Sequence, residues 1–343
     1  MSKFISKQER PQFLAEHGPK DLNSWLNKVR ENRRLVAPTK VDDLILFKEI
    51  SRVEDIVTDY VNTDLSPKEF LFPPTEVLFS IERKNGGVEL TPAKVERETV
   101  IFGMRPCDVR GIIALDKPFM EEPTDPLYKE HRDKTALVGI ACLKACPECF
   151  CSSMGGGPDD PTGFDIMLTE VKDGYLVQVL TEKGKALLPD SMLSESSVAK
   201  PKAADVSKVP AEGVNKKLRQ NFEDPYWGRL ADRCIHCNMC SYVCPTCYCF
   251  DIRDYPNKSK TNRVRSWESC QSAGFTKIAG GYDPRANKGT RMRQRFAHKL
   301  LYFPEQFGVS HCIGCGRCVK SCPVNIDIRE IIQDVQKLGA KGE

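Results

Sequence analysis

The chain has 343 residues, with 51 Lys and Arg against 47 Asp and Glu, so its formal net charge is only +4. Apolar residues make up 40% and charged residues 29%, a composition that excludes disordered and fibrous classes. No run of 18 apolar residues occurs, which excludes a membrane-spanning helix, and the first ten residues lack the apolar core of a signal peptide. We therefore expect a cytoplasmic protein of two or three domains.

Residues 1–189 predict a mixed α+β domain. Leu22, Trp25, Leu26 and Val29 recur at helical spacing, which predicts a short amphipathic helix over about 21–32. Apolar runs predict strands, and two glycine-containing turns predict hairpins. The expected strands are 44–47, 77–81, 99–103 and 136–140, and the expected hairpins join 77–81 to 87–90 through Asn85-Gly86-Gly87 and 164–169 to 175–180 through Lys172-Asp173-Gly174.

Sixteen cysteines are the unusual feature of the composition. None precedes residue 107, five lie between Cys107 and Cys151, and eleven lie between Cys234 and Cys322. Dense disulfides belong mainly to small exported proteins, whereas this chain is long and shows no export signal. Clustering of this kind therefore indicates metal binding.

A short internal repeat gives the strongest signal, because both copies have the spacing C-x2-C-x2-C-x3-C-P of bacterial ferredoxins. Three closely spaced thiolates fit three iron corners of one cubane, and Gly314 and Gly316 allow loop amides to point at the cluster. Zinc is the weaker alternative, since its sites usually use two separated C-x2-C pairs. The fourth cysteine of each run ligates the other cluster in two-cluster ferredoxins. The expected ligands are Cys234, Cys237, Cys240 and Cys322 for one [4Fe–4S] cluster, and Cys312, Cys315, Cys318 and Cys244 for the other.

Residues 219–343 therefore predict a ferredoxin-like domain for two [4Fe–4S] clusters, and residues 190–218, rich in Ser, Ala, Lys and Pro, predict a linker. Asp327 and Glu330 resemble a capping box that opens a helix. Its apolar stripe should pack over the clusters. The stripe consists of Ile328, Ile331, Ile332, Val335 and Leu338. His236, inside the first loop, is either a solvated spacer or a residue that adjusts the potential of its cluster.

The ferredoxin-like domain contains a long insert, expected at 250–305, because 67 residues separate Cys244 from Cys312. Between Arg253 and Lys299 the sequence has twelve Lys and Arg against three acidic residues. These charges could form a docking face for an acidic partner, compensate anionic clusters, or bind nucleic acid, which we do not expect. Three further cysteines could shield the clusters or serve as extra ligands: Cys247, Cys249 and Cys270.

The five N-terminal cysteines predict a third [4Fe–4S] cluster, although their spacing follows no standard rule. Cys107 and Cys142 each lie near the end of a predicted strand. The favoured ligands are Cys107, Cys142, Cys149 and Cys151; the alternative is a set of small buried residues with free thiols. No motif for a flavin, a nicotinamide or a catalytic group of any other kind occurs in the chain.

Six segments occur together and in order, and they carry a family resemblance. They are 73–79, 102–108, 150–155, 244–251, 265–270 and 291–299. Over about residues 30–335 the chain resembles the β subunit of cytoplasmic sulfhydrogenases, the group 3 [NiFe] hydrogenases, and the iron–sulfur subunit of anaerobic sulfite reductase.

The resemblance implies an iron–sulfur electron-transfer subunit of a multisubunit anaerobic redox complex. Such a subunit relays electrons between a flavin-containing subunit, linked to NAD(P)H or ferredoxin, and a redox catalytic subunit of the hydrogenase, sulfite reductase or heterodisulfide reductase type. It would perform no substrate chemistry of its own. The residues leave two alternatives open: a regulatory or nucleic-acid-binding cluster protein, and a thiol/disulfide reductase that uses the 142–151 loop.

Overall fold

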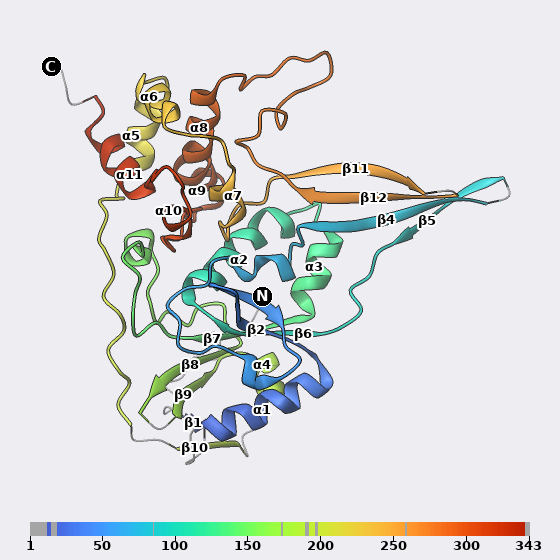
Figure 1. Ribbon diagram of the computed structural model, residues 1–343, viewed down its shortest axis with the longest axis vertical. Helices are drawn as coiled ribbons and strands as arrows, with labels where there is room; N and C mark the ends of the chain where they lie inside the picture. Colours follow the sequence, from blue (N-terminus) through green and yellow to red (C-terminus); the bar gives the residue numbers. More distant parts are fainter. Residues whose placement is uncertain are drawn as a thin grey trace.

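The computed structural model describes residues 12–14, 19–84, 86–172, 174–188, 192–195, 198–257 and 259–339. The first eleven residues, which led to the expectation of a cytoplasmic location, lie outside the described residues, as do Asn85 and Asp173 of the two expected turns. Figure 1 shows a mixed sheet at one end of the molecule, the helices of the C-terminal part at the other, and a long β arm extending to one side.

The mixed sheet has the strand order β10-β1-β9-β8-β7-β6-β2-β3. Its central strands β2, β6, β7 and β8 are parallel, and the outer pairs are antiparallel. The strands are β10 (Leu193–Glu195), β1 (Gln12–Leu14), β9 (Gly174–Val179), β8 (Ile166–Val171), β7 (Thr135–Ile140), β6 (Thr99–Met104), β2 (Arg34–Val41) and β3 (Leu44–Glu49).

Helices cover both faces of this sheet, so every residue of β6 and β7 is buried. On one face, Trp25 of α1 (Pro19–Asn32) packs with Phe102. On the other face, Val109 of α2 (Pro106–Met120) belongs to the same core as Ile101. Two shorter helices complete this part: α3 (Pro126–Asp133) and α4 (Glu182–Leu187). The predicted amphipathic helix and the four predicted strands are confirmed.

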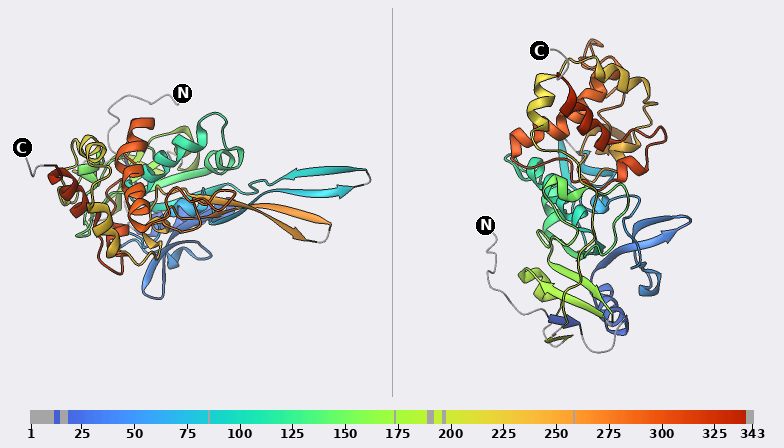
Figure 2. Two further views of the ribbon diagram at one scale, coloured as in Figure 1. Left: turned by 90° about the horizontal axis from the view of Figure 1, so that it is seen from above. Right: turned by 90° about the vertical axis from the view of Figure 1, so that its left-hand side faces the viewer.

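The β arm is a second sheet with the order β11-β12-β4-β5, antiparallel throughout. Figure 2 shows that its two hairpins extend well beyond the body. The strands are β4 (Thr75–Lys84), β5 (Gly87–Pro92), β11 (Phe250–Asn257) and β12 (Lys260–Trp267). Both predicted hairpin pairings, β4 with β5 and β8 with β9, are confirmed. The first part of the insert, however, pairs with a strand of the N-terminal part.

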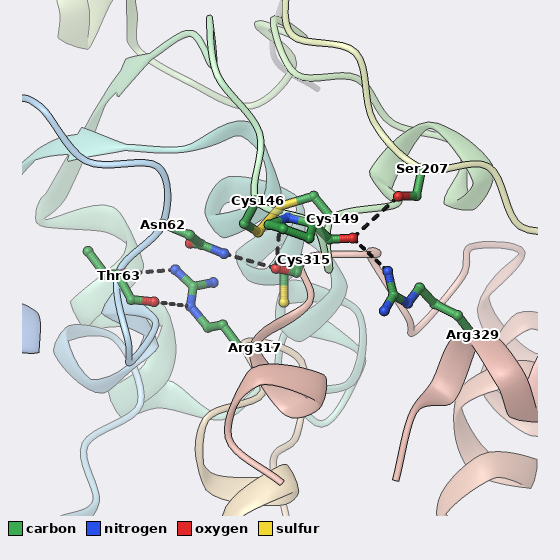
Figure 3. The surroundings of a disulfide bond; sticks show 9 residues. Asn62, Thr63, Cys146, Cys149, Ser207, Cys315, Arg317 and Arg329 are labelled. Atoms are coloured by element: carbon green, nitrogen blue, oxygen red, sulfur yellow. Dashed lines mark hydrogen bonds between the residues drawn. A yellow bond between two sulfur atoms is a disulfide. The ribbon is translucent and has the colours of Figure 1, made fainter. Parts of the chain in front are cut away.

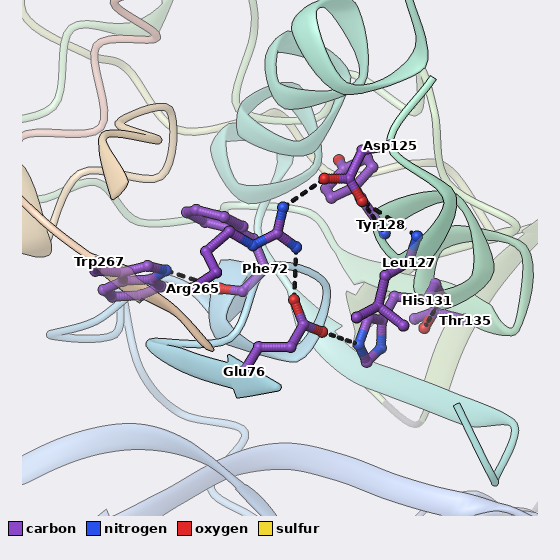
Figure 4. Close-up of polar contacts among 9 residues, drawn as sticks. All are labelled: Phe72, Glu76, Asp125, Leu127, Tyr128, His131, Thr135, Arg265 and Trp267. Atoms are coloured by element: carbon purple, nitrogen blue, oxygen red, sulfur yellow. Dashed lines mark hydrogen bonds and ion pairs between the residues drawn. The ribbon is translucent and has the colours of Figure 1, made fainter. Parts of the chain in front are cut away.

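A buried ion pair holds the base of the arm against the body (Figure 4). Arg265 of β12 pairs with Glu76 of β4 and with Asp125, the N-cap of α3, each at 2.5 Å. His131 of α3 also lies 2.8 Å from Glu76. The Trp267 indole donates to the Phe72 carbonyl at 3.1 Å. These contacts join segments that are far apart in the sequence.

The C-terminal part packs short helices around the loops that carry its cysteines (Figure 1). Trp227 stacks on Phe296 in its core. The helices are α5 (Val214–Gln220), α6 (Tyr226–Asp232), α7 (Met239–Tyr242), α8 (Lys288–Ala297) with a π-helical continuation (His298–Tyr302), α9 (Phe303–Phe307), α10 (Arg317–Lys320) and α11 (Ile328–Lys337). The helix predicted after Asp327 is confirmed as α11, and four of its five stripe residues are buried. The α+β class is therefore confirmed.

The segment 198–213 connects the two parts without helix or strand. It is nevertheless bonded to the cysteine-bearing loop of the N-terminal part. Ala204 N donates to the Cys142 carbonyl at 2.9 Å and Ser207 N to the Cys149 carbonyl at 3.1 Å. This connection therefore forms part of the wall around the N-terminal cysteines.

Candidate metal centres

The first copy of the repeat and the last cysteine of the second copy surround one space, here called the first cavity. Its wall includes Cys234, Cys237, Cys240 and Cys322. The loop turns tightly because His236 and Asn238 have φ values of 56° and 64°. Backbone amides then face the sulfurs, with His236 N 3.4 Å from Cys234 Sγ and Ile326 N 3.2 Å from Cys322 Sγ. Hydrogen bonds of this kind adjust the potential of thiolate-bound clusters.

The second copy forms the second cavity together with the last cysteine of the first. Its wall includes Cys312, Cys315, Cys318 and Cys244. Gly314 has a φ of 67°, and a Cβ there would lie 2.6 Å from the backbone of Phe150. Phe150 N donates to the Gly314 carbonyl at 2.8 Å. Glycine is therefore required where this loop meets the N-terminal part.

Four N-terminal cysteines line the third cavity. They are Cys107, Cys142, Cys149 and Cys151. Cys107 lies in the first turn of α2, and Cys142 follows β7. Because β6 and β7 are parallel neighbours, the segments that follow them emerge at the same edge of the sheet. The fold thus brings together the four cysteines favoured from the sequence.

Cys146 does not line the third cavity but forms a disulfide with Cys149 (Figure 3). This loop lies against the second cavity, where Asn62 Nδ2 donates to the Cys315 carbonyl at 2.9 Å. Arg329 of α11 fixes the loop further by donating to the Pro147 carbonyl at 2.6 Å. A sulfur in a disulfide is not a thiolate, so Cys149 could ligate iron only when this bond is reduced.

The three cavities form a continuous row. Cys318 and Ile328 line both the first and the second cavity. Gly314 and Cys315 line both the second and the third. Arg317, between the second pair of ligand candidates, is buried and pairs with Asp108 of α2 at 2.7 Å. The row therefore crosses from the C-terminal part into the N-terminal part through a buried contact.

Each cavity has one buried cation in its wall: Arg295 in the first, Lys299 in the second and Arg105 in the third. Among the described residues, these cations bond to carbonyls, a hydroxyl or cysteine sulfur rather than to carboxylates. A buried cation is costly unless an anion compensates it. Four thiolates around an iron–sulfur cluster supply that anion, so the donor set fits the group.

The same sulfurs keep two of these cations protonated. Burial lowers the pKa of Lys299, but the adjacent Cys244 and Cys247 sulfurs outweigh this effect and raise the pKa well above its ordinary value. Burial likewise opposes the cationic form of Arg295, and the Cys240 and Cys247 sulfurs raise its pKa. Both side chains therefore stay charged beside the thiol-lined space.

The basic insert is only partly a surface. Arg265, Arg291, Arg295 and Lys299 are all buried. Arg295 Nη1 lies 3.8 Å from Cys247 Sγ, so part of this charge faces sulfur rather than solvent. Charge compensation is thus favoured over a nucleic-acid-binding face. His236 lines the first cavity, half-buried, and is not a solvated spacer; burial lowers its pKa.

Sequence reasoning missed the cations as site residues. Arg291, Arg295 and Lys299 recur every four positions, a spacing that places them on one helical face and could have indicated a buried basic stripe. Arg105 stands two residues before Cys107 but has no comparable periodic signal. Within the described residues, no group of three His, Cys, Asp or Glu side chains could hold a single metal ion, so the cavities carry the fit.

The fold and the thiol-lined cavities define an iron–sulfur protein of the ferredoxin type. In agreement, residues 233–326 match the 4Fe-4S dicluster domain family. Within the described part of the chain, each helix is too short or too polar to cross a membrane.

The chain is also 30% identical, over 328 residues, to sulfhydrogenase 2 subunit beta of Pyrococcus furiosus. The alignment covers 91% of this chain and 95% of the relative. The chain therefore belongs to the family of sulfhydrogenase β subunits, as the resemblance implied. No solved structure matches it.

Proposed function

We propose that this chain is an electron-transfer subunit that holds three [4Fe–4S] clusters in a row, one in each cavity. Each cluster, when bound, takes up or releases one electron. The shared walls carry this proposal, since Cys318 borders the first two cavities and Cys315 the last two. The proposed ligands are Cys234, Cys237, Cys240 and Cys322 in the first cavity, Cys312, Cys315, Cys318 and Cys244 in the second, and Cys107, Cys142, Cys149 and Cys151 in the third.

The domain division follows from the same row. Residues 219–343 would hold the first two clusters, residues 1–189 the third, and residues 190–218 would connect them. The protein fixes the clusters, excludes water through Ile328 and Phe150, and compensates their charge through buried cations. It would perform no substrate chemistry of its own.

The exposed end of the row is at the first cavity. Cys237 is exposed there, and Ile235 and Met239 beside it are 61% and 41% exposed. Arg233 and Lys288, both exposed, flank this surface. An apolar patch with a basic rim suits an acidic redox partner, a flavin-containing or ferredoxin-linked protein.

The relative is named as a subunit, and we propose that this chain likewise works in an assembly, beside that partner and a redox catalytic subunit. Reduced ferredoxin, an acidic one-electron donor, tests the exposed end. The Arg233→Glu/Lys288→Glu variant should accept electrons more slowly than wild type, and added salt should slow wild type more than the variant. Equal rates and equal salt dependence would contradict docking at this surface.

Electron paramagnetic resonance of the fully reduced protein tests the row itself. Clusters in cavities with a common wall should couple magnetically, so the wild-type spectrum should differ from the sum of isolated cluster signals. Removing the middle cluster with Cys312→Ser should simplify the spectrum to uncoupled signals. A wild-type spectrum that is already a simple sum would contradict the proposal.

The Cys146–Cys149 disulfide favours a second candidate, a thiol/disulfide reductase at the 142–151 loop. In that case Cys149 would be redox-active rather than a ligand. The protein would bind iron only in the first two cavities, and alkylation of Cys146 would stop turnover of a disulfide substrate. Alkylation of Cys146 without such loss would reject this candidate.

A further inference from the structure

Three cysteines of the C-terminal part line none of the three cavities, and two of them lie side by side at the base of the β arm. Cys249 immediately precedes β11, and Cys270 follows β12. Pairing of Phe250 with Trp267 aligns these strand ends, and Glu268 N donates to the Cys249 carbonyl at 2.9 Å. The Cys249 and Cys270 side chains are hydrogen-bonded to each other, and the Cys270 amide donates to the Cys249 sulfur.

This arrangement differs from that of the cluster ligands. The thiols of each ligand set surround a space, whereas Cys249 and Cys270 are in mutual contact. Two thiols within hydrogen-bonding range can form a disulfide with little backbone movement. Wrapping a cubane would instead require them to separate.

The surroundings favour a thiolate at this position. Hydrogen bonding to Cys249 lowers the pKa of Cys270 to about 6, although burial opposes this, and Arg295 and Lys299 lower it further. The pKa of Cys249 is raised, first by its bond to Cys270. At neutral pH the pair therefore holds one thiolate and one thiol, the form that forms and exchanges disulfides.

The pair also lies close to the row of cavities. Cys247, two residues before Cys249, is hydrogen-bonded to Cys244 of the second cavity. Arg295 contacts the Cys247 sulfur and lines the first cavity. A short path of sulfur and buried side chains thus connects the pair to the proposed cluster sites.

We propose that Cys249 and Cys270 form a reversible dithiol–disulfide couple that exchanges two electrons with the iron–sulfur clusters, which rests on the proposed function. On oxidation the sulfur–sulfur bond forms, the S–H bond of Cys249 breaks, and its proton passes to solvent. The two electrons released reduce two oxidised clusters by one each. The reverse step restores the thiol and the thiolate. The couple gives a chain of one-electron carriers a store for an electron pair.

The test uses the anaerobically purified holoprotein, oxidised or reduced with dithiothreitol of defined redox state and then alkylated. Mass spectrometry should find a linked 249–270 peptide after oxidation and two alkylated cysteines after reduction. Cys247→Ser is the matched control and should keep the link, whereas Cys249→Ser and Cys270→Ser should lose it. In coulometric titration, wild type should take up about two electrons more per chain than Cys249→Ser.

Iron content separates this proposal from the proposed function. Cys249→Ser and Cys270→Ser should retain the wild-type iron content. A loss of about four iron atoms would show that the pair ligates a cluster and would overturn the proposal. Absence of the linked peptide, or equal electron uptake by variant and wild type, would overturn it as well. Wild-type protein without iron would instead reject the proposed function.

Discussion

Lys299 Nζ lies 3.2 Å from Cys244 Sγ, with both side chains buried in the wall of the second cavity. The ammonium group also donates to Thr246 Oγ1 at 3.0 Å. A positive charge in this position favours the more negative, reduced state of a cluster bound there.

Lys299→Met should therefore lower the reduction potential of the second cluster. A hydrogen bond to a charged group contributes about 1.5–3 kcal/mol, which corresponds to roughly 65–130 mV for one electron. A redox titration followed by electron paramagnetic resonance measures the shift. Lys320→Met, which removes an exposed cation paired with Asp64, is the control and should shift the potential little. Equal shifts in the two variants would contradict this role of Lys299.

Cys322→Ser should remove about four iron atoms, from the first cavity, although Cys322 belongs to the second copy of the repeat. Combination with Cys234→Ser should cause no further loss, because both residues line the same cavity. Combination with Cys312→Ser should remove about four more. Iron analysis of the two double variants measures this directly. Assignment of each repeat to its own cluster predicts the opposite pattern.

Cys151→Ser should remove the third cluster and about four iron atoms, since Cys151 lines the third cavity. Cys146→Ser is matched to it, because Cys146 lies in the same loop but outside the cavity wall, and this variant should retain all iron. It also frees Cys149 from its disulfide partner. Iron loss in Cys146→Ser instead of Cys151→Ser would show that the ligand set is wrong.

Arg265→Met should destabilise the base of the β arm by about 3–5 kcal/mol, because it leaves the buried Glu76 carboxylate without its guanidinium (Figure 4). Arg263→Met breaks an exposed pair with Asp254 on the same strand and should cost at most about 1 kcal/mol. Urea unfolding followed by circular dichroism compares the two variants. Similar midpoints would mean that the buried pair contributes little.

Local patterns predicted much of the fold. The period of Leu22, Trp25, Leu26 and Val29 identified α1, and glycine-containing turns identified two hairpins. The strand β2 was missed, since Pro38 interrupts its apolar run. The helix α2 was missed as well, because it is buried around much of its circumference and includes Gly111 and Pro118.

The arm and the charge balance of the site depended on contacts that no local pattern contains. Arg265 and Glu76 are 189 positions apart, so neither segment alone indicates their pairing. The repeat spacing did specify which cysteines lie together, because the geometry of a cubane restricts it. The cations were less predictable, since a basic residue in a sequence is usually solvated and only the folded chain shows which ones face sulfur.

Iron and acid-labile sulfide per chain, measured on anaerobically purified protein, test the row of three clusters most directly. Four iron atoms in each cubane give an expected value of about twelve, with a similar amount of sulfide. About eight would contradict the third cluster and leave the N-terminal part without an electron carrier. Four or fewer would contradict the row itself.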